Sequence, residues 1–438
     1  NVEVSGISTI SGINLITFQQ KISLDQIENI HITSSDTYYI LHKGYVYAWG
    51  KNYHGQLGLG LSVGIGGADR KTPVKVASLS DVQAIESGRL HTVFLHGDGT
   101  VSIVGTNGTP GAPSHSEYST PQKVASLSGV QAIAAGYYHT VFLHGDGTVS
   151  TVGGNNEGQL GLGDSGTDTY RSTPVKVASL SGVQAIAAGS DHTVFLHVDG
   201  TVSAVGWNYY GQLGLGDRGS MTERKTPEKV ASLSDVQAIA AGFGHSVFLH
   251  GDGTVSTAGQ EVTNVGDPPE RKTPVKVASL SDVKAIAAGY NCTVFLHGDG
   301  TISTVGSNYF GQLGLGGAVG FDGYRSTPVK VSNLSGITSL IMMPPSLILI
   351  RKVGDIYYSG VLSNTFLNGM FINTGTTVEG NTSVSGNTSV TTFTQIPNNP
   401  VLITNTLVNQ NRYFGAYLEK GIVYSDITSP NPLHYPQG

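Results

Sequence analysis

Residues 130–163 read VQAIAAGYYHTVFLHGDGTVSTVGGNNEGQLGLG, and residues 173–181 read TPVKVASLS. The same module recurs nearly unchanged along the chain. The glycine that ends its first segment falls at Gly88, Gly136, Gly189, Gly242 and Gly289, in steps of 48, 53, 53 and 47 residues. A repeat of about 50 residues indicates stacked supersecondary units within one array, not separate domains.

Each unit contains four short apolar runs. In the unit that begins at Val130 they cover 130–134, 140–144, 148–152 and 174–179, and all are too short for helices and rich in Val, Thr, Ile and Phe. Between the second and third runs, Asp146-Gly147 supplies the positive φ angles of a tight hairpin. Four strands cannot bury both faces of one sheet, whereas a ring of such sheets can. The sequence therefore predicts an all-β fold, a β-propeller of four-stranded blades.

A glycine-rich loop carries a resemblance to a known family. The pattern Gly-x-Asn-x-x-Gly-Gln-Leu-Gly-Leu-Gly occurs at 50–60, 153–163, 206–216 and 306–316, and a Gly-x-x-His-Thr strand precedes the last three of these loops in variant or complete form. Together they resemble the regulator of chromosome condensation repeat, which implies a propeller that usually has seven blades. The stretches 106–119 and 260–271 replace the loop with shorter segments that contain proline.

Degenerate copies of the unit flank the clear ones. Residues 38–41 and 45–49 match the hairpin, with 17–24 before them as an outer strand, and further hairpins are expected at 346–358 and 414–424. We count eight units, which leaves seven or eight blades open. The expected organisation is an N-terminal segment at 1–16 that closes the ring or contacts a partner, and a propeller at 17–438. A low-complexity insertion of Asn, Thr, Ser and Gly lies at 366–392.

Composition narrows the partner classes. Only 12% of residues are charged, the net charge is −6 and no basic run is present, so we expect no nucleic acid partner. No apolar stretch is long enough to span a membrane, so we expect no membrane insertion. The single cysteine, Cys292, cannot form an internal disulfide.

Histidines and aspartates recur once per unit, which predicts structural roles. His91, His139, His192 and His245 precede the second strand, where they are expected to hydrogen-bond the backbone between neighbouring sheets, and a further histidine and an aspartate stand at each hairpin turn. A zinc site needs its ligands within ~2 Å of one metal, which residues spaced one blade apart cannot achieve. Asp164 and Asp168 could bind calcium, but the remaining ligands of a calcium loop are missing. We therefore expect no metal, no cofactor, no catalytic residues and no enzyme activity.

Positions that vary between nearly identical units are the candidate binding residues, because the blade itself does not require them. One class directly precedes the repeated histidine, and a second lies in the glycine-rich loop. Each class should cluster on one face, where its aromatic, Arg and Asp side chains are typical of binding hot spots. The alternative for both classes is that they pack loop on loop between blades, and for the loop aromatics this alternative is favoured. The first class comprises Arg89, Leu90, Tyr137, Tyr138, Ser190, Asp191, Phe243, Tyr290 and Asn291, and the second comprises Tyr53, Tyr209, Tyr210, Tyr309 and Phe310.

Three function classes follow. The favoured one is a non-catalytic binding or structural protein, a rigid propeller that displays loops to a protein or glycan partner, at an extracellular, cell-surface or virion location, with self-assembly into a homo-oligomer as a further possibility. The family resemblance implies an alternative, a guanine-nucleotide exchange factor for a small GTPase, for which the location would be cytoplasmic. A third class is an enzyme inhibitor or lectin-like binder, since a bacterial β-lactamase inhibitor is similar to this fold.

Overall fold

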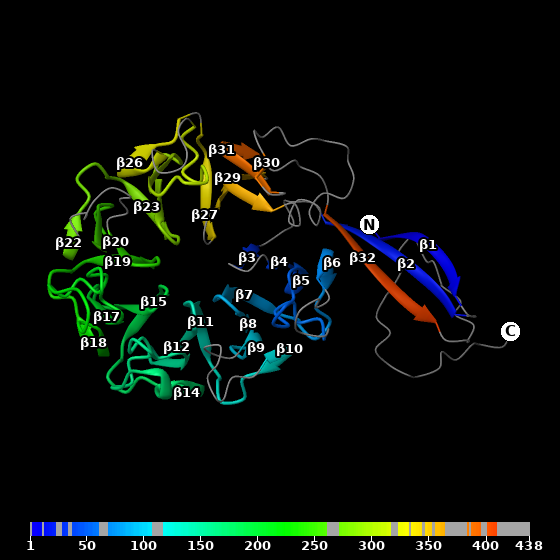
Figure 1. The fold of residues 1–438 in the computed structure, drawn as a ribbon, viewed down its shortest axis with the longest axis horizontal. Helices are drawn as coiled ribbons and strands as arrows, with labels where there is room; N and C mark the ends of the chain where they lie inside the picture. The colour runs from blue at the N-terminus through cyan, green and yellow to red at the C-terminus, as the bar shows by residue number, and fades with distance from the viewer. Residues whose placement is uncertain are drawn as a thin grey trace.

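Seven antiparallel sheets form a ring around a central channel in the computed structural model of the protein (Figure 1). The inner strand of the seventh sheet contacts the inner strand of the first, which closes the ring. The structure describes residues 2–10, 13–22, 29–33, 37–60, 69–106, 117–260, 271–316, 323–332, 334–343, 347–352, 355–363, 383–384, 387–395 and 401–409.

Each blade begins with the strand that lines the channel and ends with the strand at the circumference. Blade 1 contains β3 (Asn29–Ile32), β4 (Thr37–His42), β5 (Tyr45–Gly50) and β6 (Arg70–Lys75). Blade 2 contains β7 (Val82–Ser87), β8 (His91–His96), β9 (Val101–Thr106) and β10 (Glu117–Lys123). Blade 3 contains β11 (Val130–Ala135), β12 (His139–His144), β13 (Val149–Gly153) and β14 (Arg171–Lys176), with the 3-10 helix η2 (Thr167–Thr169) before β14.

The remaining blades follow the same order. Blade 4 contains β15 (Val183–Ala188), β16 (His192–His197), β17 (Val202–Gly206) and β18 (Arg224–Lys229). Blade 5 contains β19 (Val236–Ala241), β20 (His245–His250), β21 (Val255–Gly259) and β22 (Arg271–Lys276). Blade 6 contains β23 (Val283–Ala288), β24 (Cys292–His297), β25 (Ile302–Gly306) and β26 (Arg325–Lys330). Blade 7 contains β27 (Ile337–Met343), β28 (Leu347–Lys352), β29 (Asp355–Ser363), β31 (Asn387–Gln395) and β30 (Ser383–Val384).

The predicted β-propeller is confirmed, and its described part has seven blades. The eighth unit, expected at 414–424, lies outside the described residues, as do 366–382 of the expected insertion, whereas 387–392 belong to β31. The expectation that residues 17–24 form the outer strand of blade 1 is wrong. Residues 13–22 instead form β2 (Ile13–Ile22) of a separate sheet with β1 (Val2–Ile10) and β32 (Val401–Asn409), beside blade 1 (Figure 1). Because β6 directly follows the first glycine-rich loop, it completes blade 1 without a strand from the N-terminus.

Hydrophobic side chains of neighbouring blades form the core. A phenylalanine in the second strand of blades 2 to 6 packs against the preceding blade and is at most 1% exposed in every case. Phe195 of blade 4, for example, lies among Val141, Leu143 and Val149 of blade 3. Burial of each such ring contributes about 1.5–3 kcal/mol relative to exposure. The ring is therefore held together between blades, as the repeat pattern requires.

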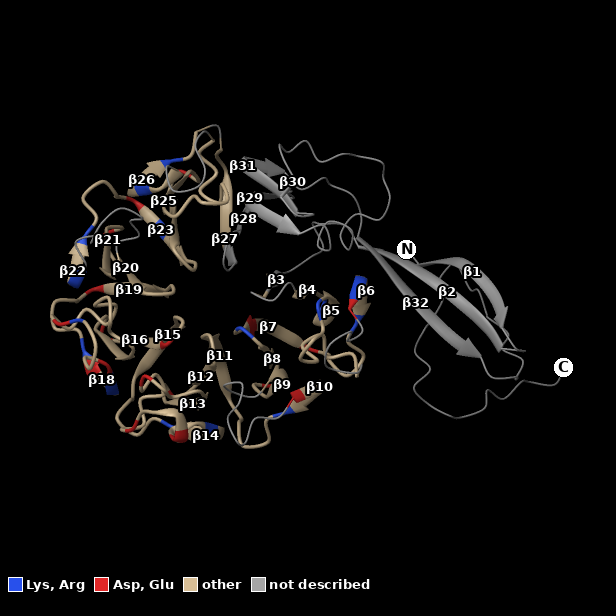
Figure 2. Cartoon of the chain, in the orientation of Figure 1, with Lys and Arg blue, Asp and Glu red and all other residues tan. Residues whose placement is uncertain are grey.

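Charged side chains lie largely at the circumference. Figure 2 shows Lys and Arg on the outer strands, including β6, β14, β18 and β22. Turn aspartates lie nearby: Lys330 forms an ion pair of 3.3 Å with Asp299, and Lys276 lies 3.9 Å from Asp252. No helix among the described residues is long and apolar enough to cross a membrane. The expected absence of a nucleic acid partner stays a prediction.

The hairpin turn between the second and third strands carries a steric rule that the repeat alone does not reveal. In blade 2, a Cβ on Gly97 would lie 2.5 Å from the carboxylate of Asp81, the residue directly before the inner strand. In blade 3 the residue before the inner strand is Gly129, and a Cβ on Gly145 would have no neighbour closer than 3.7 Å. In blade 4 the residue before the inner strand is also a glycine, Gly182, and the turn position that corresponds to Gly97 and Gly145 is occupied by Val198.

We therefore expect opposite outcomes from the same substitution in two blades. Gly97→Val should destabilise the protein by about 1–3 kcal/mol, because the side chain must displace Asp81. Gly145→Val should change stability by less than about 0.5 kcal/mol, because its site resembles that of Val198. Urea unfolding of both variants measures this difference. Equal loss of stability in the two variants would show that Asp81 is not the obstacle.

Candidate functional site

The variable pairs before the repeated histidine converge at one mouth of the central channel. Each inner strand ends just before the repeated glycine, and the pair follows that glycine, so all five pairs lie at the same end of the ring. A cavity of about 380 Å³ opens there. The first member of every pair lines it: Arg89, Tyr137, Ser190, Phe243 and Tyr290. Their second members, Leu90, Tyr138, Asp191 and Asn291, with Gly244 in blade 5, are not in its lining. The five pairs, first and second members together, form the channel-mouth face.

Hydrogen bonds between blades hold the backbone of this face. The N–H of Arg89 donates to the carbonyl of Tyr137 (3.0 Å), and the N–H of Tyr137 donates to the carbonyl of Ser190 (3.0 Å). The N–H of Phe243 donates to the carbonyl of Tyr290 (3.2 Å), and the Ser190 hydroxyl oxygen lies 3.2 Å from the carbonyl oxygen of Phe243. A rigid frame lowers the entropy cost of binding, because its side chains are already positioned.

Two carboxylates with raised pKa values lie at the edge of the face. Burial raises the pKa of Asp191, which accepts hydrogen bonds from the Ser190 hydroxyl (2.9 Å) and the Gln159 side-chain amide (3.2 Å). Burial also raises the pKa of Glu157, with a further contribution from the charge of Asp191. In blade 2, Arg89 donates to the Tyr138 hydroxyl of blade 3 (2.5 Å). The face thus combines carboxylates, one guanidinium and aromatic rings.

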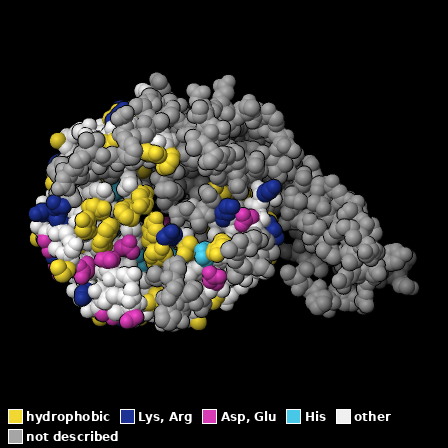
Figure 3. Space-filling view, viewed as in Figure 1, with side chains coloured by type: hydrophobic (Ala, Val, Ile, Leu, Met, Phe, Trp, Pro, Cys, Tyr) yellow, Lys and Arg dark blue, Asp and Glu magenta, His cyan; other side chains and the backbone are white. Residues whose placement is uncertain are grey.

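The glycine-loop aromatics divide into two groups. In blade 4, Tyr209 and Tyr210 pack against Trp207, whose ring centroid lies 5.5 Å from that of Phe243, and Phe243 lies 4.4 Å from Tyr290. These five rings form a continuous cluster, the aromatic cluster, that reaches the channel mouth. Figure 3 shows hydrophobic side chains gathered near the centre of the ring beside acidic ones.

The loops of blades 1 and 6 contribute local pairs of rings. Tyr53 contacts His54, with centroids 4.7 Å apart, and Tyr309 contacts Phe310 at 4.9 Å. Tyr53, Tyr309 and Phe310 stay 40–47% exposed. A role for these pairs in binding stays a prediction.

The repeated histidines lock each blade to the next through hydroxyl groups, not through backbone as expected. Thr193 of blade 4 donates its hydroxyl proton to the carbonyl of Gln159 in the blade 3 loop (2.8 Å). Its oxygen must therefore accept the hydrogen bond from Nε2 of His139 in blade 3 (3.0 Å). Ser246 makes the same two contacts with Gln212 (2.8 Å) and His192 (3.1 Å). The histidine is thus a neutral structural donor, and burial lowers the pKa of His139 and His192 to about 3.

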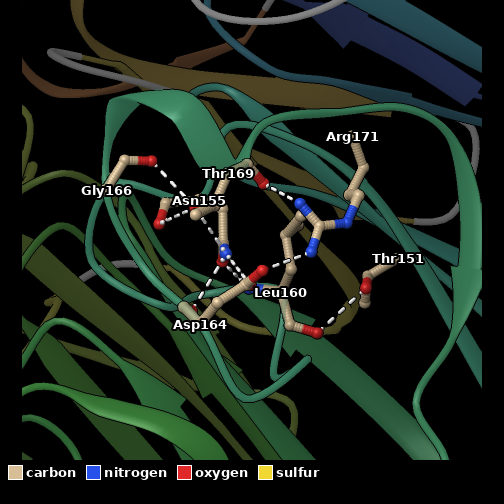
Figure 4. A network of polar contacts seen from close by, with 7 residues as sticks. All are labelled: Thr151, Asn155, Leu160, Asp164, Gly166, Thr169 and Arg171. Carbon is tan, nitrogen blue, oxygen red and sulfur yellow. Dashed lines mark hydrogen bonds and ion pairs between the residues drawn. The ribbon is translucent and has the colours of Figure 1, made fainter.

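A polar network shapes the glycine-rich loop of blade 3 (Figure 4). The buried Asn155 side chain accepts a hydrogen bond from the Leu160 N–H (3.1 Å) and donates to the Asp164 carboxylate (2.8 Å). Arg171 forms an ion pair with the same carboxylate, so Asp164 already has two partners within the protein. Across the described part of the chain, no three His, Cys, Asp or Glu side chains are placed to hold a metal ion.

Sequence reasoning missed two residues at the mouth. Trp207 forms the centre of the aromatic cluster, and its only signal was that it varies within the glycine-rich loop. Glu86 lines the cavity, and burial raises its pKa to about 7. The corresponding residue is alanine in blades 3 to 6, so comparison of the repeats could have found it.

Curated relatives match parts of the chain. The probable E3 ubiquitin-protein ligase HERC6 of Homo sapiens is 32% identical over 226 residues, which are 50% of this chain and 17% of that protein. The secretion-regulating guanine nucleotide exchange factor of Bos taurus is 31% identical over 230 residues, covering 50% and 36% of the two chains. The regulator of chromosome condensation of Mus musculus is 29% identical over 220 residues, covering 49% and 39%. The chain thus aligns with well under half the length of each of these relatives.

Solved structures agree with the fold. Human WBSCR16 superposes with a TM-score of 0.61 at 22% identity, covering 74% of this chain and 86% of that one. Prp20p of Saccharomyces cerevisiae, described with its binding properties to Gsp1p and histones, gives a TM-score of 0.58 at 23% identity over 69% and 76% of the chains. At these identities the likeness concerns the fold alone.

These relatives correct two expectations. The favoured role, a structural protein that displays loops at a surface or on a virion, is wrong, and so is the extracellular location. The relatives are named for chromosome condensation, ubiquitin ligation and nucleotide exchange, which take place inside cells, and they favour the exchange-factor alternative. Profiles of the RCC1-like domain and of the regulator of chromosome condensation (RCC1) repeat match residues 14–265 and 283–312. Since the first of these covers more than half of the chain, the protein belongs to the RCC1-like domain family.

Proposed function

We propose that this propeller binds a small GTPase through its channel-mouth face and promotes release of the bound guanine nucleotide. The observation that carries the proposal is the convergence of five variable residues, Arg89, Tyr137, Ser190, Phe243 and Tyr290, around one mouth of a rigid ring. Two relatives support it, one named as an exchange factor and one as a regulator of chromosome condensation. As part of this proposal, the protein acts inside the cell.

Exchange requires only differential binding. A protein that binds the nucleotide-free GTPase more tightly than the nucleotide-bound form must, by thermodynamic linkage, weaken nucleotide binding by the same factor. No covalent bond changes, so the expectation that the chain is not an enzyme in the bond-making sense remains part of the proposal. The alignment covers only 17% of the ubiquitin ligase relative. Ligase activity is therefore not part of the proposal for this chain.

The chemistry of the face suits this task. Aromatic rings such as Phe243 and Tyr290 supply apolar anchors, which dominate interface energetics. The nucleotide-free GTPase exposes a phosphate site made of a Lys side chain and backbone N–H groups. Asp191 and Glu157, two partly desolvated carboxylates at the edge of the mouth, are complementary to that positive site. Nothing in the relatives supports a glycan partner or self-assembly, so neither is part of this proposal.

Release of fluorescent GDP from a panel of purified small GTPases tests the function. We expect one GTPase to release nucleotide at least tenfold faster with the protein present. In that case Phe243→Ser combined with Tyr290→Ser should lower the stimulation at least tenfold, about 1.4 kcal/mol of lost binding to the transition state.

The control variant is Val198→Ser, because Val198 is 70% exposed at a hairpin turn on the opposite end of the strands. Its stimulation should equal that of the parent protein. If no GTPase responds, or if the double variant retains full stimulation, the channel-mouth face is not an exchange surface.

A further inference from the structure

The channel behind the mouth has walls of small apolar residues. Blades 3 to 6 each contribute the sequence Ile-Ala-Ala-Gly at the end of the inner strand, and all four copies line the cavity or its rim, as with Ala134 and Ala135 of blade 3. The cavity of about 380 Å³ is large enough for an inserted side chain. Besides Arg89, Tyr137 and Tyr290 at the rim, its described lining contains two further titratable side chains: His31 of β3 and Glu86 of β7.

Glu86 is the exception in this wall. It stands where blades 3 to 6 carry Ala134, Ala187, Ala240 and Ala287, in strands that are otherwise almost identical. It lies two residues after Ala84, which packs toward blade 3, so Glu86 occupies the same face of β7 and borders the cavity. Burial alone raises the pKa of its carboxyl to about 7, and no cation among the described residues lowers it.

The nearest candidate counter-charges have other roles. Arg89 is held at the rim by the Tyr138 hydroxyl, and its guanidinium also lies 5.6 Å from the Tyr137 ring centroid. Burial lowers the pKa of His31 to about 4, so this imidazole is neutral near pH 7. Among the lining residues that the structure describes, Glu86 thus has the one carboxyl group, and its ionised form would gain from a cation that enters from outside.

We propose that the channel mouth binds a cationic side chain, lysine or arginine, of a protein partner, with Glu86 as its counter-charge. The methylene stem of such a side chain packs against the alanine walls, and its charged end reaches the carboxylate. Opposite charges attract more strongly in this desolvated site than in water. Asp191 and Glu157 at the edge of the face add further carboxyl groups along the path by which the cationic side chain would enter. That the partner is a small GTPase rests on the function proposed above, whereas the cation site itself does not.

The test uses n-butylammonium as the probe, since it reproduces the lysine side chain. Alanine methyl groups labelled with ¹³C report directly on the channel, because Ala134, Ala135 and Ala187 line it. We expect saturable shifts of these methyl signals with n-butylammonium and none with butyrate, which has the same number of carbon atoms and the opposite charge. Affinity should rise about tenfold between pH 6 and 8, because the Glu86 carboxyl must lose its proton, whereas His31 stays neutral.

Glu86→Ala is the decisive variant, because it installs the residue that the other blades carry and should fold normally. It should weaken probe binding at least tenfold, and Glu86→Gln should do the same without a change of shape. Ser87→Ala, the neighbouring change toward the repeat, is the matched control, since the Ser87 hydroxyl is engaged by Thr92 (3.0 Å). Equal shifts in Glu86→Ala, or an equal response to butyrate, would overturn the proposal.

An exchange assay separates this inference from the proposed function. If a responsive GTPase is found, Glu86→Ala should lower kcat/KM of exchange at least tenfold and Ser87→Ala should not. Undiminished exchange by Glu86→Ala would show that the partner does not use the channel, although the exchange function would stand. If no GTPase responds, the exchange function fails, and the probe titration alone decides whether the cation site exists.

Discussion

Lowering the pH from 7 to 5 is expected to destabilise the ring by about 7 kcal/mol, because five buried histidines resist protonation in the folded state. Burial lowers the pKa of His139 and His192 to about 3 and that of His31, His91 and His245 to about 4. In the unfolded chain each has a pKa of about 6.5. The unfolded state therefore binds more protons below pH 6.5, and stability falls as the pH falls through this window.

The magnitude follows from the size of the shifts. Each histidine contributes about 2 kcal/mol of lost stability at pH 5, or about 10 kcal/mol for the five. Glu86 acts in the opposite direction: its pKa is raised to about 7, so folding favours its protonated form, and acidification returns about 2 kcal/mol. The raised pKa values of Asp191 and Glu157 also oppose the loss. A net loss of about 7 kcal/mol is comparable to the whole stability of many domains, so we expect acid unfolding near pH 5.

Urea unfolding from pH 7.5 to 4.5 measures this dependence. His192→Cys provides the control, because Cys292 occupies the same position in blade 6. The variant should be less stable at pH 7.5, since Ser246 loses its donor, but the stability that it loses between pH 7 and 5 should be smaller by about 2 kcal/mol. A stability that stays constant between pH 7 and 5 would show that the histidines remain accessible to protons in the folded ring.

Gly136→Ala is expected to cost at least about 3–5 kcal/mol, among the largest effects of any methyl group in this fold. A Cβ at Gly136 would lie 2.1 Å from Cε1 of His139 and 2.6 Å from the carbonyl oxygen of Gly189 in the next blade. The imidazole cannot turn away without breaking its hydrogen bond to Thr193, and the carbonyl belongs to the backbone. The added methyl group must therefore push two blades apart at the channel mouth.

Gly145→Ala in the same blade is the matched control, since its Cβ would meet nothing closer than 3.7 Å. Its stability in urea should stay within about 0.5 kcal/mol of the parent protein. Adding His139→Cys to Gly136→Ala should recover part of the loss, because it removes the nearer of the two clashes. Equal stability of Gly136→Ala and the parent protein would mean that the blades can separate at little cost.

The repeat predicted the propeller because its information is local. Strand lengths, β-branched residues and Asp-Gly turns specify a four-stranded unit, and a unit of this kind must stack on copies of itself to bury its faces. The same reasoning located the pairs before the repeated histidines, such as Tyr137-Tyr138, on one face. It failed for the outer strand expected at 17–24, because residues 17–22 of this run pair instead with β32.

Long-range contacts decided the rest. Comparison of repeats within the chain could show that Glu86 and Trp207 differ from their counterparts, but only the closed ring brings Glu86 to the cavity and Trp207 to Phe243. Likewise, the sequence marked His139 as structural, whereas its partner, Thr193, and the loop carbonyl that orients the hydrogen bond come from neighbouring blades. The sequence by itself determined the blade, because the blade depends on contacts between residues near one another in the chain. Only the tertiary structure determined which residues meet at the channel mouth, because residues about 50 positions apart in the chain come together when the blades pack side by side in the ring.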